Sequence, residues 1–217
     1  MPDKEELRVE RSCIDCGALR CNKEEGVFPA FCVTHKIPEN VKAAAMAEYD
    51  DPENRRIMSV AAEVEYTGYC KWTRVQEIIE FARRMGYHKI GIATCLGLVR
   101  ESRTLAKILR SHGFEVFGIT CKAGMVPKVD VGIDEKCNAV GCNMCNPILQ
   151  AKMLNEEKTE LNIVVGLCVG HDSLFYKYSE AVTTTLISKD RVTGHNPAAA
   201  LYTAESYYGT LYGEEKE

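Results

Sequence analysis

The stretch that decides the fold lies between residues 70 and 95 and reads CKWTRVQEIIEFARRMGYHKIGIATC. Apolar side chains recur at three-to-four spacing from Trp72 to Ala82, which predicts an amphipathic helix, and Gly86 is placed to end it. The apolar run that follows, HKIGIATC at residues 88–95, predicts a short buried strand. This strand stops on a thiol, Cys95.

The same unit recurs further along the chain. A helix expected over residues 101–111 leads to the strand FEVFGITC, which ends on Cys121. A helix from Asn146-Pro147 leads to the strand LNIVVGLC, which ends on Cys168, and VTTTLIS at 182–188 predicts a fourth strand. A last helix is expected over 197–208. This alternation predicts an α/β, Rossmann-like fold, with a parallel sheet of about four strands and helices on both faces.

Three cysteines therefore end three strands that run the same way. Parallel strands linked by right-handed crossovers place Cys95, Cys121 and Cys168 at the carboxyl edge of the sheet, where open α/β sheets bind ligands. One buried cysteine is usually a small core residue, but packing alone gives no reason for three to share this edge. We therefore predict a metal or iron–sulfur centre there.

A second group of thiols precedes the Asn146 helix. Cys137, Cys142 and Cys145 follow the pattern C-x4-C-x2-C in a loop that leaves the second strand at the same edge. A CxxC pair holds two sulfurs near one metal, so these residues are candidate ligands or redox-active thiols of the same centre. The alternative is a separate zinc clip that ties down a long loop.

The N-terminal segment carries four more of the eleven cysteines. Cys13, Cys16, Cys21 and Cys32 give C-x2-C-x4-C-x10-C in a stretch with few large apolar residues. Such a segment needs a staple, and metal binding would supply the folding energy that burial does not. We expect residues 1–38 to form a cysteine-rich metal-binding knuckle, with zinc or a cluster, and residues 39–217 to form the α/β domain.

Two further residues are candidate catalytic groups. Cys70 is placed by the pattern at a helix start beside Lys71, and both features favour a nucleophilic thiolate or a metal ligand. An ordinary cysteine on a helix face is the alternative. His171 lies three residues after Cys168, where it would reach the same edge as a ligand or proton donor, or be part of a capped turn.

Composition restricts the class of protein. The formal net charge of −4 gives no electrostatic reason to expect nucleic acid or a membrane as partner, and we see no signal peptide or membrane span. We expect a cytoplasmic protein, in whose reducing surroundings so many thiols indicate metal or redox chemistry. The sequence has no GxGxxG after the first strand, no P-loop and no GxSxG, which disfavours a nucleotide-binding Rossmann enzyme.

The ordered motifs CIDCGALRC, TGYCKW, GIATC, CNMCNP, GLCVGHDS and GHNPAAALYT carry a resemblance to a known family. The chain resembles, over essentially its whole length, a group of prokaryotic cysteine-rich proteins catalogued as a domain of unknown function and often labelled metal-binding. The resemblance implies a cytosolic metal-binding protein and no particular reaction.

The residues themselves favour an iron–sulfur protein. We expect a cluster, of the [4Fe–4S] kind, that performs redox or sulfur-transfer chemistry on a small molecule. The expected partner is a small-molecule substrate or an electron donor. A non-catalytic zinc module that binds a partner and a metal-free thiol or persulfide enzyme are the alternatives. The tyrosine-rich end, LYTAESYYGTLY, is a possible homodimer contact.

Overall fold

The structure, a computed structural model, describes residues 11–23 and 25–213. The chain divides into two compact units, one ending at Met58 and one beginning at Ser59, and each is described by itself. The sequence analysis predicts a boundary at residue 38 from composition. The two compact units instead meet between Met58 and Ser59, within one helix. In the part of the chain that the structure describes, every helix is too short or too polar to cross a membrane.

The first unit contains short helical elements. Helix α1 (Glu39–Ala47) has no buried residue, and helix α2 (Pro52–Gly68) begins in this unit and ends in the second. Asp51 caps α2, because its Oδ1 accepts hydrogen bonds from the backbone N–H of Glu53 at 2.8 Å and of Asn54 at 3.1 Å. The polar composition of this unit thus leaves it with little apolar core.

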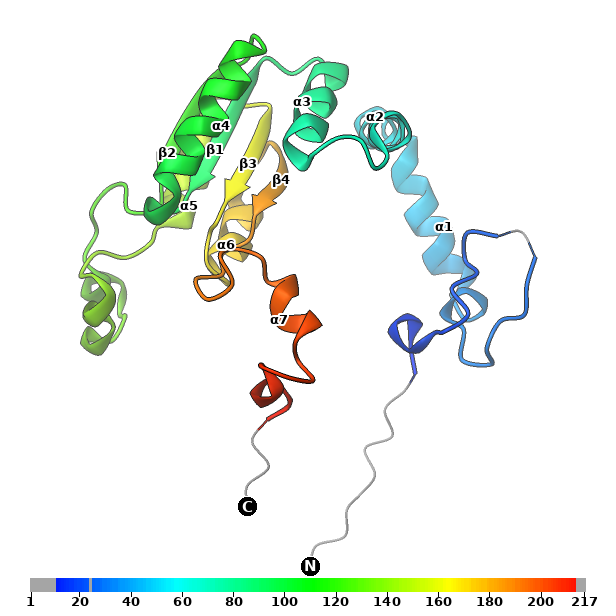
Figure 1. The fold of residues 1–217 in the computed structure, drawn as a ribbon. Coiled ribbons are helices and arrows are strands. Elements are labelled where there is room, and N and C mark those ends of the chain that lie inside the picture. Colours follow the sequence, from blue (N-terminus) through cyan, green and yellow to red (C-terminus); the bar gives the residue numbers. More distant parts are fainter. Residues whose placement is uncertain (1–10, 24, 214–217) are drawn as a thin grey trace, which may run out of the picture. The chain divides into compact units, whose positions relative to one another are not determined.

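The second unit is built on a four-stranded sheet (Figure 1). Strands β1 (Lys89–Thr94), β2 (Glu115–Thr120), β3 (Leu161–Val165) and β4 (Val182–Ile187) are all parallel, in the order β2-β1-β3-β4. The predicted α/β fold is confirmed. In the described part of this unit, five α-helices lie wholly within it, beside short 3-10 turns: α3 (Arg74–Met85), α4 (Val99–Ser111), α5 (Pro147–Glu156), α6 (His171–Tyr178) and α7 (Ala198–Tyr202).

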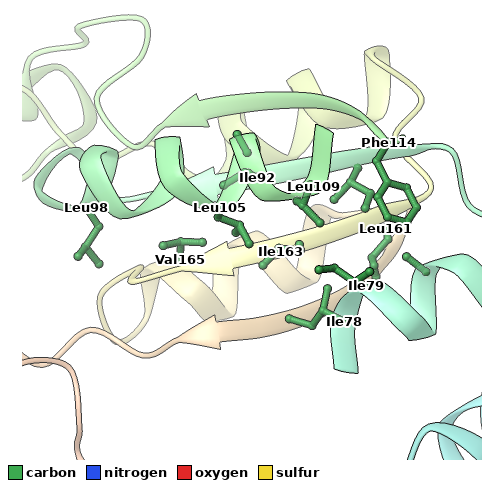
Figure 2. Close-up of a cluster of buried hydrophobic side chains, with 13 residues drawn as sticks. Ile78, Ile79, Ile92, Leu98, Leu105, Leu109, Phe114, Leu161, Ile163 and Val165 are labelled. Carbon is green, nitrogen blue, oxygen red and sulfur yellow. The ribbon is translucent and has the colours of Figure 1, made fainter. Parts of the chain in front are cut away.

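Alternating side chains of the central strands feed two cores. Ile90, Ile92 and Ile163 pack with helices α3 and α4 on one face of the sheet (Figure 2). Ala93 and Val164, which point the other way, pack with helices α5 and α6. Because every second residue of a strand faces the same side, continuous apolar runs are what a sheet covered on both faces requires.

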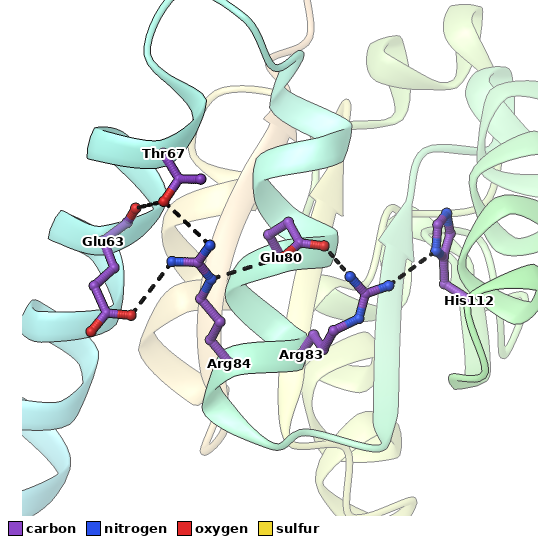
Figure 3. A network of polar contacts seen from close by, with 6 residues as sticks. All are labelled: Glu63, Thr67, Glu80, Arg83, Arg84 and His112. Atoms are coloured by element: carbon purple, nitrogen blue, oxygen red, sulfur yellow. Dashed lines mark hydrogen bonds and ion pairs between the residues drawn. The ribbon is translucent and has the colours of Figure 1, made fainter.

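A polar network joins the end of α2 to α3 and α4 (Figure 3). Arg84 lies 3.4 Å from Glu63 and 3.9 Å from Glu80, and Arg83 bonds both Glu80 and, at 3.3 Å, Nδ1 of His112. Arg84 also lies over the ring of Trp72. The network fixes the helix that precedes β1.

The strand order defines where a ligand site is expected. The chain moves from β1 to β2 on one side and then crosses to β3 on the other, so the connections after β1 and β3 diverge. In open α/β sheets, ligands bind at such a switch point, outside the carboxyl ends of the strands. The predicted last helix is wrong in length: α7 ends at Tyr202, and turns follow in place of a helix to residue 208.

Candidate metal and thiol site

Three thiols from three segments meet at the carboxyl edge. Cys95 directly follows β1, Cys121 directly follows β2, and Cys145 precedes α5. Backbone hydrogen bonds hold the segments together: the N–H of Cys121 donates to Thr94 O at 2.8 Å, and the N–H of Asn146 donates to Cys121 O at 2.7 Å. The sheet ladder therefore brings Cys95 to Cys121, and the Asn146 bond brings Cys145 to the same point.

Cys121 is the central member of this trio, which we call the edge cluster (Cys95, Cys121 and Cys145). Its side chain is only 3% exposed, and it lies within hydrogen-bonding reach of both other thiols. Its Sγ also accepts a hydrogen bond from the backbone N–H of Leu96 at 3.4 Å. The other two thiols are half-buried at the rim.

The three thiols perturb one another's ionisation. A hydrogen bond from Cys121, with help from the Gly97 backbone and Lys189, lowers the pKa of Cys95 to about 5 despite burial. Hydrogen bonds from Cys121 and His171, with the charge of Lys122, lower the pKa of Cys145 to about 4. The same contacts, first that with Cys145, raise the pKa of Cys121, which stays protonated.

A thiol has one proton, so Cys121 donates to one neighbour at a time. Both neighbours have a second source of positive potential: Lys189 beside Cys95, and His171 with Lys122 beside Cys145. The pKa of His171 is raised in turn by its bond to Cys145. The site therefore stabilises thiolates at neutral pH, the form that binds metals and attacks electrophiles.

Cys168 differs from the prediction. Strand β3 ends at Val165, and Gly166 then turns the chain at φ +70°, so Cys168 lies beyond a turn and not on the strand. A side chain at Gly166 would also lie 2.0 Å from Leu98 Cδ1, so this turn requires glycine. The Cys168 Sγ accepts a hydrogen bond from Arg191 Nη2 at 3.2 Å, and this contact raises the pKa of Arg191.

Cys137 and Cys142 lie elsewhere in the loop. Cys137 belongs to a short 3-10 helix, Glu135–Val140, and its carbonyl accepts a bond from the buried side chain of Lys128. Cys142 is exposed, with Sγ 3.9 Å from Asn143 Oδ1. Neither contact joins them to the edge cluster, so of the predicted loop thiols the structure brings in Cys145.

The four N-terminal cysteines lie in the first unit. Cys13 begins a 3-10 turn, closed by a bond from Cys16 N–H to Cys13 O at 3.2 Å, while Cys32 is buried and Cys21 is exposed. Within residues 11–23 and 25–213, no group of three or more His, Cys, Asp or Glu side chains is arranged to hold a metal ion, either among the N-terminal cysteines or at the edge cluster. The N-terminal knuckle stays a prediction.

The position of Cys70 corrects the sequence analysis. Helix α3 begins at Arg74 and is capped by Thr73, so Cys70 is not at a helix start; it lies exposed in the preceding turn with φ +56°. It takes part in none of the contacts that build the edge cluster. His171, by contrast, reaches the cluster from the first residue of α6, as the sequence predicts.

Three basic residues of the site were missed by sequence reasoning. Lys122 follows Cys121 directly, and Lys189 and Arg191 follow β4. Each one comes just after a strand, which places it at the carboxyl edge. The rule that residues after parallel strands lie at the carboxyl edge of the sheet predicts the positions of these basic residues as well as those of the thiols.

Comparison with known families gives a family without an assigned activity. The family model described as "Protein of unknown function (DUF1847)" matches residues 32–186. The chain belongs to this family. An uncharacterized protein of Methanocaldococcus jannaschii is 49% identical over 191 residues, which are 87% of this chain and 94% of that protein. The region matched by the family model, residues 32–186, includes the edge cluster and leaves out Cys13, Cys16 and Cys21.

Two solved structures of Dph2 from Pyrococcus horikoshii are also similar, one of them titled as containing a 4Fe-4S cluster. The first structure aligns with a TM-score of 0.35 and 16% identity. The structure titled with the cluster aligns with a TM-score of 0.31 and 19% identity. The alignments cover 64% of this chain and 32% of Dph2, so the chain spans about a third of that protein. A likeness at this level transfers neither activity nor cofactor.

Proposed function

We propose that the edge cluster is the thiolate ligand set of an iron–sulfur cluster. The observation that carries the proposal is the convergence of Cys95, Cys121 and Cys145 from three separate segments onto the carboxyl edge of the sheet. Cys168, held by Arg191, and His171, held by Cys145, are the candidates for a further ligand.

The residues present fit such a group in their chemistry. Thiolates are the ligands that Fe–S clusters, zinc and Cu(I) prefer, and the thiols here are already placed in contact with one another. Backbone N–H groups point at sulfur, from Leu96 to Cys121 and from Gly97 to Cys95, which is the kind of hydrogen bonding that adjusts a cluster's potential. Lys122 and Lys189 would offset the negative charge of the thiolates.

A bound cluster would supply one-electron transfer or an iron site for sulfur chemistry on a small molecule. The chain's own residues would set the surroundings. Phe175 and Leu167 close the apolar side next to Cys121, and His171 would hold a proton beside Cys145. The four N-terminal cysteines would form a second metal centre, with a structural or an electron-transfer role. Its ligands would be close together because they are close in sequence, whereas the sheet brings together the ligands of the edge cluster.

A metal-free thiol function is the second candidate. The lowered pKa values of Cys95 and Cys145 make both nucleophiles at neutral pH, and Cys121 stands within reach as a resolving thiol. A zinc site is the third candidate, since the three thiols of the edge cluster and His171 are the residue types of a Cys3His site, which they would form only after rearranging around the metal. The same measurements separate all three.

The test is anaerobic purification of the full chain, followed by iron, sulfide and zinc analysis with visible and EPR spectra. The expected result is iron and sulfide with a brown chromophore. Cys121→Ser should abolish the signal of the edge site, whereas Cys142→Ser, which removes an exposed thiol of the same loop, should leave it unchanged.

Other outcomes would point elsewhere. Stoichiometric zinc without a chromophore would replace the cluster by a zinc site. A protein that stays colourless and metal-free after reconstitution with iron and sulfide would overturn metal binding and leave the thiol function.

A further inference from the structure

Three basic side chains lie beside the edge cluster, and within residues 11–23 and 25–213 none of them forms an ion pair with a carboxylate. Lys189 bonds Cys95, Arg191 bonds Cys168 Sγ at 3.2 Å, and Lys122 acts on Cys145 while its Nζ donates to Asn143 O. Among the residues described, the ion pairs lie on other surfaces and involve none of these three side chains. We call this group, Lys122, Lys189 and Arg191, the cationic rim.

The nearest carboxylates are engaged with backbone. Asp190, between the two rim residues after β4, accepts bonds from the N–H of Val192 at 2.9 Å and of Thr193 at 3.0 Å. Asp172 accepts from the N–H of Ser173 at 2.8 Å and acts electrostatically on His171. Neither carboxylate forms an ion pair with the rim.

The turn that carries two of the cations is fixed. His195 N–H donates to Asp190 O at 2.8 Å, and Asp190 N–H bonds His195 Nδ1 at 3.1 Å, so the turn is closed from both ends. Lys189 and Arg191 flank Asp190 and are therefore presented from a constrained backbone. A fixed backbone reduces the part of the ordering cost that binding an anion would otherwise require there.

The basic side chains beside the edge cluster outnumber its two thiolates, Cys95 and Cys145. Three cations, together with His171, come from three segments and repel one another unless anions lie between them. The thiolates offset part of this charge. Asp172 and Asp190 keep their negative charge, but their oxygens accept from backbone N–H groups, so the charged groups that contact the thiols are cations. Cations grouped in this way at the carboxyl edge of a parallel sheet favour a small anion.

We propose that the cationic rim binds the anionic group, a carboxylate or a phosphate, of a small-molecule substrate and holds that substrate against the edge cluster. The proposal rests on the proposed function in one respect: it takes the edge cluster as the reacting centre. The rim itself is formed by lysine and arginine side chains of this chain and needs no metal to be in place.

The test compares two alkylating reagents of nearly the same shape, iodoacetate, which carries a carboxylate, and iodoacetamide, which is neutral. Both form an S–C bond with the same thiolate and release iodide, so the ratio of their rates cancels the fraction of thiolate present. The ratio is measured for each cysteine by mass spectrometry on metal-free, anaerobic full chain. Cys142, exposed in the neighbouring loop, is the internal reference.

The expected ratio at Cys95 and Cys145 is roughly tenfold higher than at Cys142 at low ionic strength, since a focused positive potential raises local anion concentration by that order. Half-molar salt should remove most of the difference, as its screening length is only about 4 Å. The double variant K189Q/R191Q should lower the ratio to that of Cys142. The charge-retaining variant K189R/R191K should preserve it, and Lys152→Gln, on exposed α5 surface, should not change it.

Competition at constant ionic strength identifies the anionic group. Inorganic phosphate and acetate are added separately, and the one that protects Cys145 from iodoacetamide marks the class. Equal ratios at all cysteines, or a high ratio with no protection by either anion, would overturn the proposal. Iron content is measured independently, so loss of the cluster hypothesis and loss of anion binding are distinguishable.

Discussion

The edge cluster and the N-terminal cysteines are two ways of gathering thiols. Cys95, Cys121 and Cys145 come from distant segments and are joined by the sheet ladder, in partly buried surroundings with cations beside them. Cys13, Cys16, Cys21 and Cys32 are close in sequence and lie in a unit with little core. The first group is placed by the fold, whereas the second would have to help create its own fold.

The difference has an energetic consequence. The second unit has two apolar cores to order the edge cluster before any metal binds. The first unit has no comparable core among its described residues, so metal binding there would also be folding. The two sites should therefore respond differently to the same treatment.

The largest expected effect is a separation of metal content and folding between the two regions. Cys16→Ser/Cys32→Ser should remove the N-terminal metal and make the first unit sensitive to limited proteolysis, while the edge site keeps its metal. Cys121→Ser should do the reverse, with loss of edge metal and no new cleavage near the N-terminus. Metal analysis and mass spectrometry of the digests give both readouts.

Loss of metal from both sites in either variant would contradict two separate centres, because the two groups of cysteines would then hold one centre together. A first unit that stays as resistant to protease after chelation as before it would contradict the claim that metal binding folds this unit. Cys142→Ser serves as the control for the effect of removing any loop thiol.

The pH dependence of thiol reactivity gives the next largest effect. In metal-free protein the pKa of Cys145 is about 4, against about 8.5 for a free thiol. At pH 6 nearly all of Cys145 should be thiolate, compared with well under a hundredth of free cysteine, and its alkylation rate should decline only as the pH falls towards about 4. His171→Gln should move this decline to higher pH.

The sign of the stability effect follows from the same shift. A thiol whose pKa is lower in the folded state stabilises that state above its unfolded pKa, and the contribution is lost as pH falls through the folded pKa. Cys95, with a pKa of about 5, acts in the same direction, and the raised pKa of Cys121 opposes both at alkaline pH.

An alkylation rate of Cys145 that follows the pH profile of free cysteine would contradict the hydrogen bonds and charges described around this thiol.

The fold was predictable because its signals are local. Three-to-four spacing with Gly86, followed by an apolar run, predicts the end of α3 and both ends of β1 to within a residue, although α3 begins later than the spacing suggests, at Arg74. The repeat of this unit implies a parallel sheet. The rule that parallel strands end at one edge then placed Cys95 and Cys121 together. Sequence-local patterns and topology were sufficient for these two thiols.

The rest of the site depends on turns that patterns do not specify. Cys168 was expected at a strand tip, but Gly166 turns the chain two residues earlier. Cys145 joins the cluster through one backbone bond, from Asn146 to Cys121 O, and nothing in the spacing C-x4-C-x2-C selects it over Cys142. Lys189 and Arg191 are brought in by a capped turn after β4.

A core substitution should test how far the edge cluster depends on the sheet. A methyl group at Gly91 would lie 2.1 Å from Asn162 Oδ1 and 2.9 Å from Leu154, both fully buried. Gly91→Ala should destabilise the second unit by about 1–3 kcal/mol, measured by thermal or urea unfolding, because the buried neighbours must shift. Gly118→Ala is the matched control, since its nearest contact is an ordinary 3.7 Å.

This pair sharpens the contrast between the regions. Gly91→Ala should weaken metal retention at the edge in proportion to its destabilisation and leave the N-terminal cysteines unaffected. Equal stability of the two variants would show that the packing around β1 tolerates the methyl group.

The smallest expected effect concerns Gln150, a fully buried residue of α5. Its Nε2 donates to Thr94 O at 3.1 Å and to Ile119 O at 2.8 Å, which joins the strand ends that precede Cys95 and Cys121. Its Oε1 is buried without a hydrogen-bond partner in the described structure. Gln150 thus acts as a positioning residue for the spacing of the two thiols.

Gln150→Leu should cost only about 1 kcal/mol of unfolding free energy, because the loss of two hydrogen bonds is partly offset by removal of the unpartnered oxygen. Its effect on the site should be larger than its effect on the fold. With this side-chain link lost and only the backbone bonds of the ladder left between the strand ends, Cys121 should donate less well to Cys95, and the pKa of Cys95, read from its alkylation profile, should rise towards that of a free thiol. Cys145, which Asn146 holds to Cys121 independently, should keep its profile; a parallel change at both thiols would assign Gln150 a purely structural role.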